Sequence, residues 1–449
     1  MSNNTFLIGA ASAFSGDRQD AAGPVVDALI ASGKPAALIY ETLAERTLAL
    51  AQIERRRDHD AGFDPWLDDI VGPVLKRCLE NRINIVGNFG AANPRGAARR
   101  LRALAAEQGL APPRIAVIEG DDVSGPSYRQ ALRNALGDNL DEGAVVSANV
   151  YLGADSIADA ILAGAQIVVA GRVSDPALTV GPLLAHFKWK RDDWMRRGKA
   201  VMIGHVLECG CQATGGYFAD PGYKDVPDLA HVGFPIAEID ENADCVITKP
   251  AGTGGVVVPA SIKEQLLYEL DDTAAYVTPD AIADISECTI EAVGPDRVAM
   301  RNVKGRAWPD TLKVLVCHEG GWLAEAEISY AGPRAEGRAR IAADIVRARL
   351  GATLPLRVDL IGVLSLHADD GGTLLAQRPA GSARDVRLRI STRHDDRQLA
   401  DKLNREVMAL YTCGPAGGGG VRTSIKPRLS TTACYLPRAL FPSRFEMME

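Results

Sequence analysis

The sequence predicts an α/β protein with a doubly wound parallel sheet, an inserted β-rich region and a C-terminal α+β unit. Over residues 1–195, short apolar runs alternate with amphipathic segments rich in Ala, Leu and Arg, a pattern typical of βαβ units. Over residues 196–330 the runs are longer and rich in Gly and Pro. Residues 331–449 open with a helical pattern and continue in the order β-β-α-β. These changes predict three domains with those bounds.

The first domain is expected to place helices between its strands. Its apolar runs predict strands at Thr5–Ala10, Ala36–Tyr40, Ile83–Asn88, Arg114–Ile118, Val145–Val150 and Ile167–Ala170. One intervening helix, residues 97–110, has Leu101 and Leu104 on one face and ends at Gly109. Another begins near Asp155, a residue type favoured as an N-cap.

The other two domains are expected to contain more strand. In the middle region we expect strands at Lys199–His205, Ala237–Ile239, Cys245–Thr248, Ser286–Val293, Arg297–Val303, Leu312–Cys317 and Trp322–Ile328, with one helix at Ser261–Leu270. The last region is expected to contain a helix at Gly332–Leu350, strands at 358–366 and 385–392, a helix at Asp395–Leu410 and a strand at 425–436.

The composition is that of an ordinary soluble globular protein. Of the 449 residues, 47% are hydrophobic and 24% charged. The net charge of −7 and the aromatic content of 5% disfavour a nucleic-acid partner. Because the chain has neither a long apolar run nor a basic N-terminal leader, we expect a cytoplasmic protein that does not bind membranes. Its eight cysteines have no framework spacing, so we expect reduced thiols.

Polar turns follow five of the predicted strands, at residues 15–18, 41–46, 88–94, 119–123 and 171–176. In an open parallel sheet the ligand crevice lies outside the carboxyl ends of the strands, so these turns are expected to meet on one rim. The candidate ligand-binding side chains in them are Asp17, Arg18, Glu41, Glu45, Asn88, Asn93, Glu119, Asp121, Arg172 and Asp175. Each one singly can instead be a helix cap or a turn former.

The segment 204–227, GHVLECGCQATGGYFADPGYKDVP, has the highest density of reactive side chains in the sequence. Its polar and thiol residues are His205, Glu208, Cys209, Cys211, Asp220 and Asp225. Ordinary core packing does not need such a set, and the glycines let the backbone approach a ligand closely. We expect this segment to fold over the rim of the sheet and to complete a site between domains.

Three interpretations of this segment compete. A zinc site would use His205, Glu208 and the two cysteines, but no second ligand pair of the usual spacing follows, so we expect no metal. A nucleophilic Cys209 would take His205 as its base from the same helix face, but the glycines argue against a helix here. In the third, which we favour, His205, Glu208, Asp220 and Asp225 transfer protons, and burial raises the pKa of Glu208.

Two glycine turns are candidate anion sites. In TKPAGTGG (248–255), backbone amides together with Thr248, Lys249 and Gly254 would surround a phosphate or carboxylate. In GPAGGGGVRTS (414–424), Arg422 would bind the same groups. Neither turn is a Walker A loop and no dinucleotide fingerprint is present, so NAD and ATP are not expected, whereas CoA or a di-acid is compatible. Alternatively, the glycines only shape tight turns.

Several of these motifs together resemble one known family. The runs IGAASAFSGDR, ETLAERTLALAQ, GNFGAANP, AGRVSDPAL, GHVLECGCQATGGYFADPGYKDVP, TKPAGTGG and GPAGGGGVRTS are similar to those of the acyclic terpene utilisation (AtuA) N-terminal family, over nearly the whole chain. The resemblance implies a cytoplasmic protein of bacterial or fungal catabolism of branched, acyclic, often CoA-activated acids. It supplies no reaction.

This chain departs from the family pattern in two ways. The family usually has a small residue where this chain has Cys211, which weakens interpretations that need both cysteines. Many relatives also carry a further C-terminal ferredoxin-like domain that opens with an AHARSGDKG-type motif, and the sequence contains no such motif. We therefore expect the role of that domain to be absent or to be met by a small partner subunit.

Together these observations predict a lyase, hydratase or isomerase that acts on a branched acyl or acyl-CoA substrate without a cofactor of its own. The expected catalytic residues are Glu208, His205, Cys209 and Asp220. A Cys-dependent acyl hydrolase or transferase and a non-catalytic acyl-ligand-binding subunit remain alternatives. The chain is expected to act alone, as a homo-oligomer or with the small partner subunit.

Overall fold

The computed structural model describes residues 4–448, apart from the side chain of Glu142, and divides the chain into two compact units. One unit comprises residues 1–317 with 431–449, and the other comprises residues 318–430. The sequence patterns place divisions elsewhere, at 195/196 and 330/331. Both structural divisions fall inside long strands, β14 (Thr311–Ala331) and β17 (Gly419–Pro437), so no linker composition marks them in the sequence. Residues Met1–Asn3 lie outside the described part of the chain.

The first unit is built on a ten-stranded sheet with the order β11-β12-β8-β7-β1-β2-β3-β6-β4-β18. Five neighbouring strands are parallel: β1 (Thr5–Ala10), β2 (Ala36–Tyr40), β3 (Asn84–Gly87), β6 (Ile167–Val169) and β4 (Ile115–Glu119). The antiparallel strands are β7 (Ile236–Asp240), β8 (Cys245–Thr248), β12 (Arg297–Arg301), β11 (Thr289–Gly294) and β18 (Arg444–Met447). The predicted α/β class is confirmed. The sheet is mixed and not purely parallel, because strands from the middle region of the sequence extend it.

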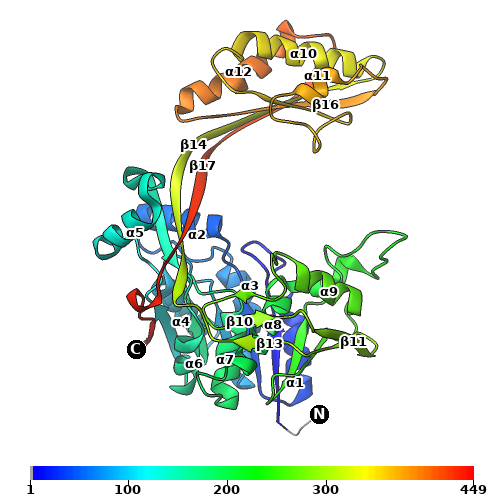
Figure 1. Ribbon diagram of the computed structural model, residues 1–449. Helices are drawn as coiled ribbons and strands as arrows, with labels where there is room; N and C mark the ends of the chain where they lie inside the picture. Colours follow the sequence, from blue (N-terminus) through cyan, green and yellow to red (C-terminus); the bar gives the residue numbers. More distant parts are fainter. Residues whose placement is uncertain (1–3, 449) are drawn as a thin grey trace. The chain divides into compact units, whose positions relative to one another are not determined.

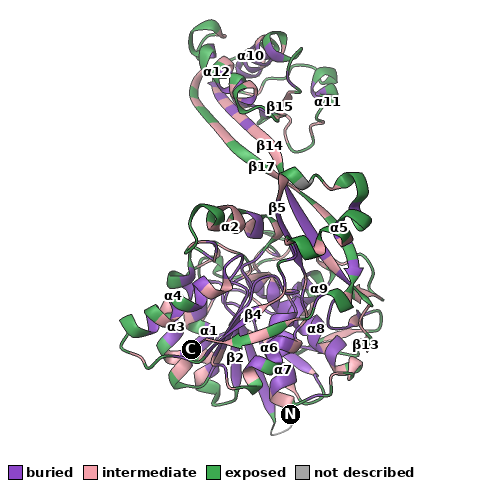
Figure 2. Ribbon diagram, turned by 90° about the vertical axis from the view of Figure 1, so that its left-hand side faces the viewer, coloured by how far each residue is buried: buried purple, intermediate pink, exposed green. Residues whose placement is uncertain are grey.

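Helices cover both faces of this sheet, because alternate side chains of the parallel strands enter two separate cores. Leu7 and Leu38 belong to one core and Ile8 and Ile39 to the other. The core of Leu7 also contains α1 (Ala22–Ser32), α3 (Leu67–Glu80) and α4 (Pro94–Glu107). The core of Ile8 contains α5 (Arg129–Leu136), α6 (Asp155–Leu162), α7 (Ala177–Phe187), α8 (Trp194–Glu208) and α9 (Pro259–Leu267). Figure 2 shows the buried residues gathered between these layers.

The predicted strand Lys199–His205 is wrong, because these residues lie within helix α8. Nearly every residue from Arg197 to Glu208 is buried, so the segment has no polar face and its sequence shows no helical period. Gly204 serves packing here: a Cβ at that position would lie 2.7 Å from Cα of Pro176. The glycine therefore allows α8 to approach the turn after β6 and does not break the helix.

Smaller elements complete the first unit. The predicted strand Val145–Val150 forms as β5, but it pairs with β14 instead of joining the ten-stranded sheet. Three short strands, β9 (Tyr276–Val277), β10 (Ile282–Asp284) and β13 (Lys304–Arg306), form a separate small sheet. Helix α2 (Glu45–Arg57) follows β2 directly.

Apart from one short helix, the second unit has the element order β-α-β-β-α-β. After the β14 segment come α10 (Ala335–Leu350), β15 (Arg357–Ile361), the short α11 (Thr373–Gln377), β16 (Asp385–His394) and α12 (Arg397–Cys413), before β17. The strands lie in the order β15-β16-β14-β17, and α10 and α12 share one core with them (Figure 1). This is a split βαβ arrangement of the ferredoxin-like type.

Candidate functional site

A cavity of about 650 Å³ in the first unit collects several of the predicted site residues. The turn after β2 contributes Glu41 and the beginning of α2, the turn after β6 contributes Arg172 and residues 174–176, and the end of α8 contributes Glu208. We call it the carboxylate cavity, and the lining residues used below are Glu41, Leu43, Glu45, Tyr151, Arg172, Asp175, Glu208, Cys209, Glu269, Tyr276 and Lys313.

Glu208 lines the carboxylate cavity and forms a buried pair with His205, which is not a lining residue. His205 and Glu208 are three positions apart on α8, so both side chains lie on the same helix face. Their Nδ1 and Oε1 atoms are 2.7 Å apart, and the side chains are 1% and 8% exposed. Within residues 4–448, neither Nε2 of His205 nor Oε2 of Glu208 makes a hydrogen bond. Both of these atoms are buried.

Burial raises the pKa of Glu208 to about 7, and His205 opposes that rise only in part. The neighbouring carboxylates of Asp175 and Glu269 add to the increase. Burial alone would lower the pKa of His205, but the adjacent Glu208 carboxylate outweighs it and raises that pKa. A carboxyl group with a pKa near the working pH can both accept and release a proton, which general acid–base catalysis requires.

A second buried carboxyl group, Glu41, lines the same cavity. Burial raises its pKa well above the ordinary value and Asp175 adds to the shift, while Arg172 opposes it. Its Oε1 accepts a hydrogen bond of 2.9 Å from the Leu43 amide, and its Oε2 accepts one from the side-chain amide of Asn88. Asn88 is therefore a support for Glu41.

Arg172 is a structural cation. Its three guanidinium nitrogens all donate to the protein, to the carbonyls of Leu43 and Val173 and to the carboxylate of Asp175. The guanidinium carbon lies 4.5 Å from the centre of the Tyr151 ring. Arg172 is 2% exposed and joins the turns after β2 and β6, so its contacts leave little capacity for a substrate anion.

Lys313, on β14, is a cation of this cavity that sequence reasoning missed. Its Nζ lies 3.8 Å from Oε1 of Glu45 and 4.8 Å from the centre of the Tyr151 ring. Glu45 also accepts a 2.9 Å hydrogen bond from the Tyr151 hydroxyl. Burial by itself would raise the pKa of Glu45. A backbone hydrogen bond, the hydrogen bond from Tyr151 and the charge of Lys313 together outweigh burial and lower this pKa. A lone lysine inside the strand-like run TLKVLVC carries no motif, so only its position in the fold reveals it.

Cys209 lines the carboxylate cavity as a thiol and not as a thiolate. Burial raises its pKa to about 12, and the nearby Glu208 carboxylate contributes to the rise. Burial likewise raises the pKa of Cys211 to about 11. Reactive cysteines instead lie beside cations that lower the thiol pKa. This arrangement does not activate either cysteine as a nucleophile.

Three predicted site residues surround a different cavity of about 370 Å³: Asn93, Glu119 and Asp121. Asn93 caps α4 by accepting a 3.0 Å hydrogen bond from the Gly96 amide. Glu119 forms ion pairs with Arg95 and Arg444. Asp121 is buried, which raises its pKa to about 6, and it accepts a 2.9 Å hydrogen bond from the Arg172 amide.

Asp17 and Arg18 are not lining residues of the carboxylate cavity, although their turn lies next to it. Asp17 accepts a 2.9 Å hydrogen bond from the Ala13 amide, and Ala13 does line the cavity. Arg18 pairs with Asp20 at 2.9 Å and donates to the Ala230 carbonyl. Both residues shape the turn after β1.

The acidic residues at 220 and 225 also lie outside the cavity lining. Asp220 is exposed and its backbone pairs with Lys224, while Asp225 accepts a 2.8 Å hydrogen bond from the Gly222 amide. They form a surface turn. The acid–base interpretation therefore concerns His205 and Glu208 alone among its four residues.

The glycine turn at residues 248–255 uses its polar groups internally, whereas the candidate cation of the other turn is exposed. Lys249 donates to the Thr253 carbonyl at 2.8 Å, and Thr248 pairs with Ile236 in the sheet. Gly254 fits because a Cβ there would lie 1.9 Å from the Asp228 carbonyl oxygen. Arg422 is exposed on β17.

Within residues 4–448, no group of three or more His, Cys, Asp or Glu side chains is arranged to hold a metal ion. No helix in that range is both long enough and apolar enough to cross a membrane. The lining of the carboxylate cavity includes Glu208, which pairs with His205, the buried carboxyl group of Glu41, and Lys313.

Comparison with known proteins gives one match. No curated protein and no solved structure matches the chain. The family model described as acyclic terpene utilisation family protein AtuA matches residues 6–447. The chain therefore belongs to the acyclic terpene utilisation family, and membership implies a role in acyclic terpene utilisation.

Proposed function

We propose that this chain is a lyase, hydratase or isomerase that transfers protons on a branched acyclic acyl or acyl-CoA substrate, with Glu208 as the acid–base group. The observation that carries the proposal is the buried His205–Glu208 pair at the cavity wall, in which the carboxyl pKa is about 7. Few structural roles need an ionisable carboxyl group with a free buried oxygen.

The proposed reaction begins with proton abstraction next to the substrate carbonyl. Ionised Glu208 takes this proton, and the electron pair of the broken C–H bond moves toward the carbonyl oxygen. The carboxylic acid of Glu41 donates a hydrogen bond to that oxygen and stabilises its developing charge. Glu208 then returns the proton, either to a leaving hydroxyl, which departs as water, or to another carbon. His205 stabilises the charged form of Glu208 between these steps.

Because the carboxylate cavity is lined mainly by acidic side chains, we expect the reacting part of the substrate to be uncharged. Glu41, Glu45, Asp175, Glu208 and Glu269 line it, and its cations are Arg172 and Lys313. Because Arg172 is occupied by protein contacts, Lys313 is the group we assign to a substrate carboxylate or to the polar arm of a thioester. We assign no resident cofactor, and CoA enters only as part of the substrate.

The test combines a substrate screen with an isosteric substitution. Purified chain is incubated with branched acyl-CoA thioesters and free acids, and mass spectrometry follows gain or loss of water, acetyl units or CoA. Glu208→Gln is expected to lower kcat by about 10²–10⁴-fold because it removes only the proton-transferring group. Glu291→Gln, an exposed glutamate on β11, is the matched control and is expected to retain full activity.

Two outcomes would contradict the proposal. Full activity in Glu208→Gln together with an inactive Cys209→Ser would favour the thiol chemistry instead. Binding of the acyl ligands without any turnover would favour a ligand-binding subunit.

A further inference from the structure

One hydroxyl group in the lining of the carboxylate cavity has no part in the reaction proposed above. It belongs to Tyr276, on strand β9, whose side chain lines the cavity. Within residues 4–448, this hydroxyl neither donates nor accepts a hydrogen bond. Unlike Oε2 of Glu208, the hydroxyl oxygen is not sealed from solvent. A ligand in the cavity can therefore reach a donor that the protein itself does not use.

The electrostatic surroundings of Tyr276 show that its hydroxyl faces the carboxylate cavity. Burial raises the pKa of this hydroxyl well above its ordinary value, and the rise is increased by the nearby groups of Glu208, Asp175, Glu269 and Cys209. All four of these residues line the carboxylate cavity. Because the pKa is raised, the hydroxyl keeps its proton at neutral pH and remains a hydrogen-bond donor.

The position of the Tyr276 ring is fixed by packing and by the backbone. The centre of the ring lies 5.0 Å from that of the His205 ring, which places Tyr276 beside the His205–Glu208 pair. The backbone of Tyr276 pairs with Ala283 of β10, and the turn between the two strands is closed by a 2.8 Å hydrogen bond from the Thr278 hydroxyl to the Ala281 carbonyl. A donor held in this way needs little reorganisation when charge develops beside it.

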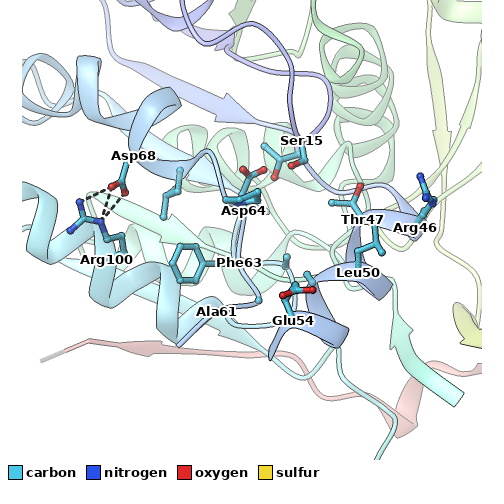
Figure 3. Close-up of a pocket in the computed structure, with 16 residues that line it drawn as sticks. Ser15, Arg46, Thr47, Leu50, Glu54, Ala61, Phe63, Asp64, Asp68 and Arg100 are labelled. Atoms are coloured by element: carbon cyan, nitrogen blue, oxygen red, sulfur yellow. Dashed lines mark hydrogen bonds and ion pairs between the residues drawn. The ribbon is translucent and has the colours of Figure 1, made fainter. Parts of the chain in front are cut away.

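A larger cavity of the first unit, of about 740 Å³, lies between α2, the loop at residues 61–65 and the start of α3 (Figure 3). Its lining contains Asp68 and Arg100, which form an ion pair of 2.6 Å, as the dashed lines in Figure 3 show. The larger cavity and the carboxylate cavity share no lining residue. Tyr276 therefore belongs to the space beside the acid–base pair and not to the larger cavity.

We propose that Tyr276 is a further catalytic residue, whose hydroxyl donates a hydrogen bond to the carbonyl oxygen of the substrate while Glu208 removes the neighbouring proton. The inference rests on the proposed function, because only that reaction places negative charge on the carbonyl oxygen. In this step the electron pair of the broken C–H bond moves to the oxygen, and Tyr276 keeps its own proton. The loss of one such donor typically lowers the rate by about 10²–10³-fold.

Tyr276→Phe tests the hydroxyl, because the variant keeps the ring and its packing on His205. We expect kcat to fall by about 10²–10³-fold while KM changes far less, since the hydrogen bond is strongest in the transition state. The matched control is Tyr217→Phe, at a tyrosine that is 87% exposed, and it is expected to retain full activity. Full activity in Tyr276→Phe would overturn the assignment, because it would leave the ring with a packing role only.

A bound carbonyl probe tests the hydrogen bond without turnover. The probes are pivaloyl-CoA and pivalamide, labelled with ¹³C at the carbonyl, and neither has a hydrogen on the neighbouring carbon for Glu208 to remove. We expect the infrared carbonyl band of the bound probe to lie at lower wavenumber in the wild type and in Glu208→Gln than in Tyr276→Phe. Calorimetry is expected to show an affinity about two- to tenfold weaker in Tyr276→Phe. The same band position in all three proteins, or no binding of either probe, would overturn the assignment.

These two experiments separate the role of Tyr276 from that of Glu208. A wild type that shows the band difference but converts no acyl substrate would contradict the proposed function and keep the hydrogen bond from Tyr276. An active wild type and an inactive Glu208→Gln, without any band difference in Tyr276→Phe, would contradict the assignment of Tyr276 alone.

Discussion

The lining of the carboxylate cavity and the glycine turn at residues 248–255 contain similar polar groups, but only the first leaves buried polar atoms available. In the turn, the Lys249 ammonium donates to the Thr253 carbonyl, and the amides of Gly254 and Gly255 donate to the carbonyls of His231 and Pro227. Around the cavity, Oε2 of Glu208 and Nε2 of His205 are buried and unpartnered within residues 4–448. A sequence motif therefore indicates a binding site only where the fold leaves its polar groups without hydrogen-bond partners beside a cavity.

The largest expected effect comes from removing the cation that holds the cavity lining together. Arg172→Met leaves Asp175 and the surrounding carboxyl groups without their buried counter-charge. Because Asp175 is 37% exposed, solvent partly screens the charge left behind, and we expect the free energy of unfolding to fall by about 2–3 kcal/mol. Urea denaturation measures this loss. Arg405→Met, which breaks the exposed pair with Asp401, is the control, and an equally large loss there would contradict the account.

A smaller effect concerns the pH dependence of stability. The folded state raises the pKa of both Glu208 and His205, so it binds more protons than the unfolded chain between about pH 4.5 and the folded pKa values. Stability contributed by the pair is therefore present at low pH and lost as the pH rises toward and through 7. In Glu208→Gln, the free energy of unfolding is expected to decrease over this pH range by about 1–3 kcal/mol less than in the wild type.

Denaturation curves across this pH range measure the difference, and Glu291→Gln serves again as the control. A wild type whose stability rises steadily from pH 4.5 to 7 relative to Glu208→Gln would show the opposite sign. That result would mean that Glu208 is held ionised by a partner and is not a proton-transfer group.

The smallest expected effect lies in the glycine turn. Lys249→Met removes the hydrogen bond to the Thr253 carbonyl and the 3.4 Å contact with Asp296. We expect a loss of about 1 kcal/mol in unfolding free energy and no change in turnover or ligand affinity. Activity assays and calorimetry would reveal the alternative, because a weakened affinity for acyl-CoA in this variant would make the turn an anion site after all.

Much of the fold was predictable from local patterns, and the site only in part. The strands Thr5–Ala10, Ala36–Tyr40 and Cys245–Thr248 form with the predicted bounds, since buried strands bounded by turns carry a strong local signal. Helix α8 was not predictable, because a helix buried on all sides has no amphipathic period. Lys313 and Tyr276 reach the carboxylate cavity through long-range packing that no local pattern encodes.

We expect Glu208 to titrate near neutrality beside His205. Isotope-edited infrared spectroscopy of the intact chain measures this titration directly. The difference between the wild-type and Glu208→Gln spectra, followed from pH 4 to 9, isolates the carboxyl band of Glu208. The account predicts conversion of the protonated to the ionised band with a pKa of about 7. A carboxylate already ionised at pH 5 would contradict it.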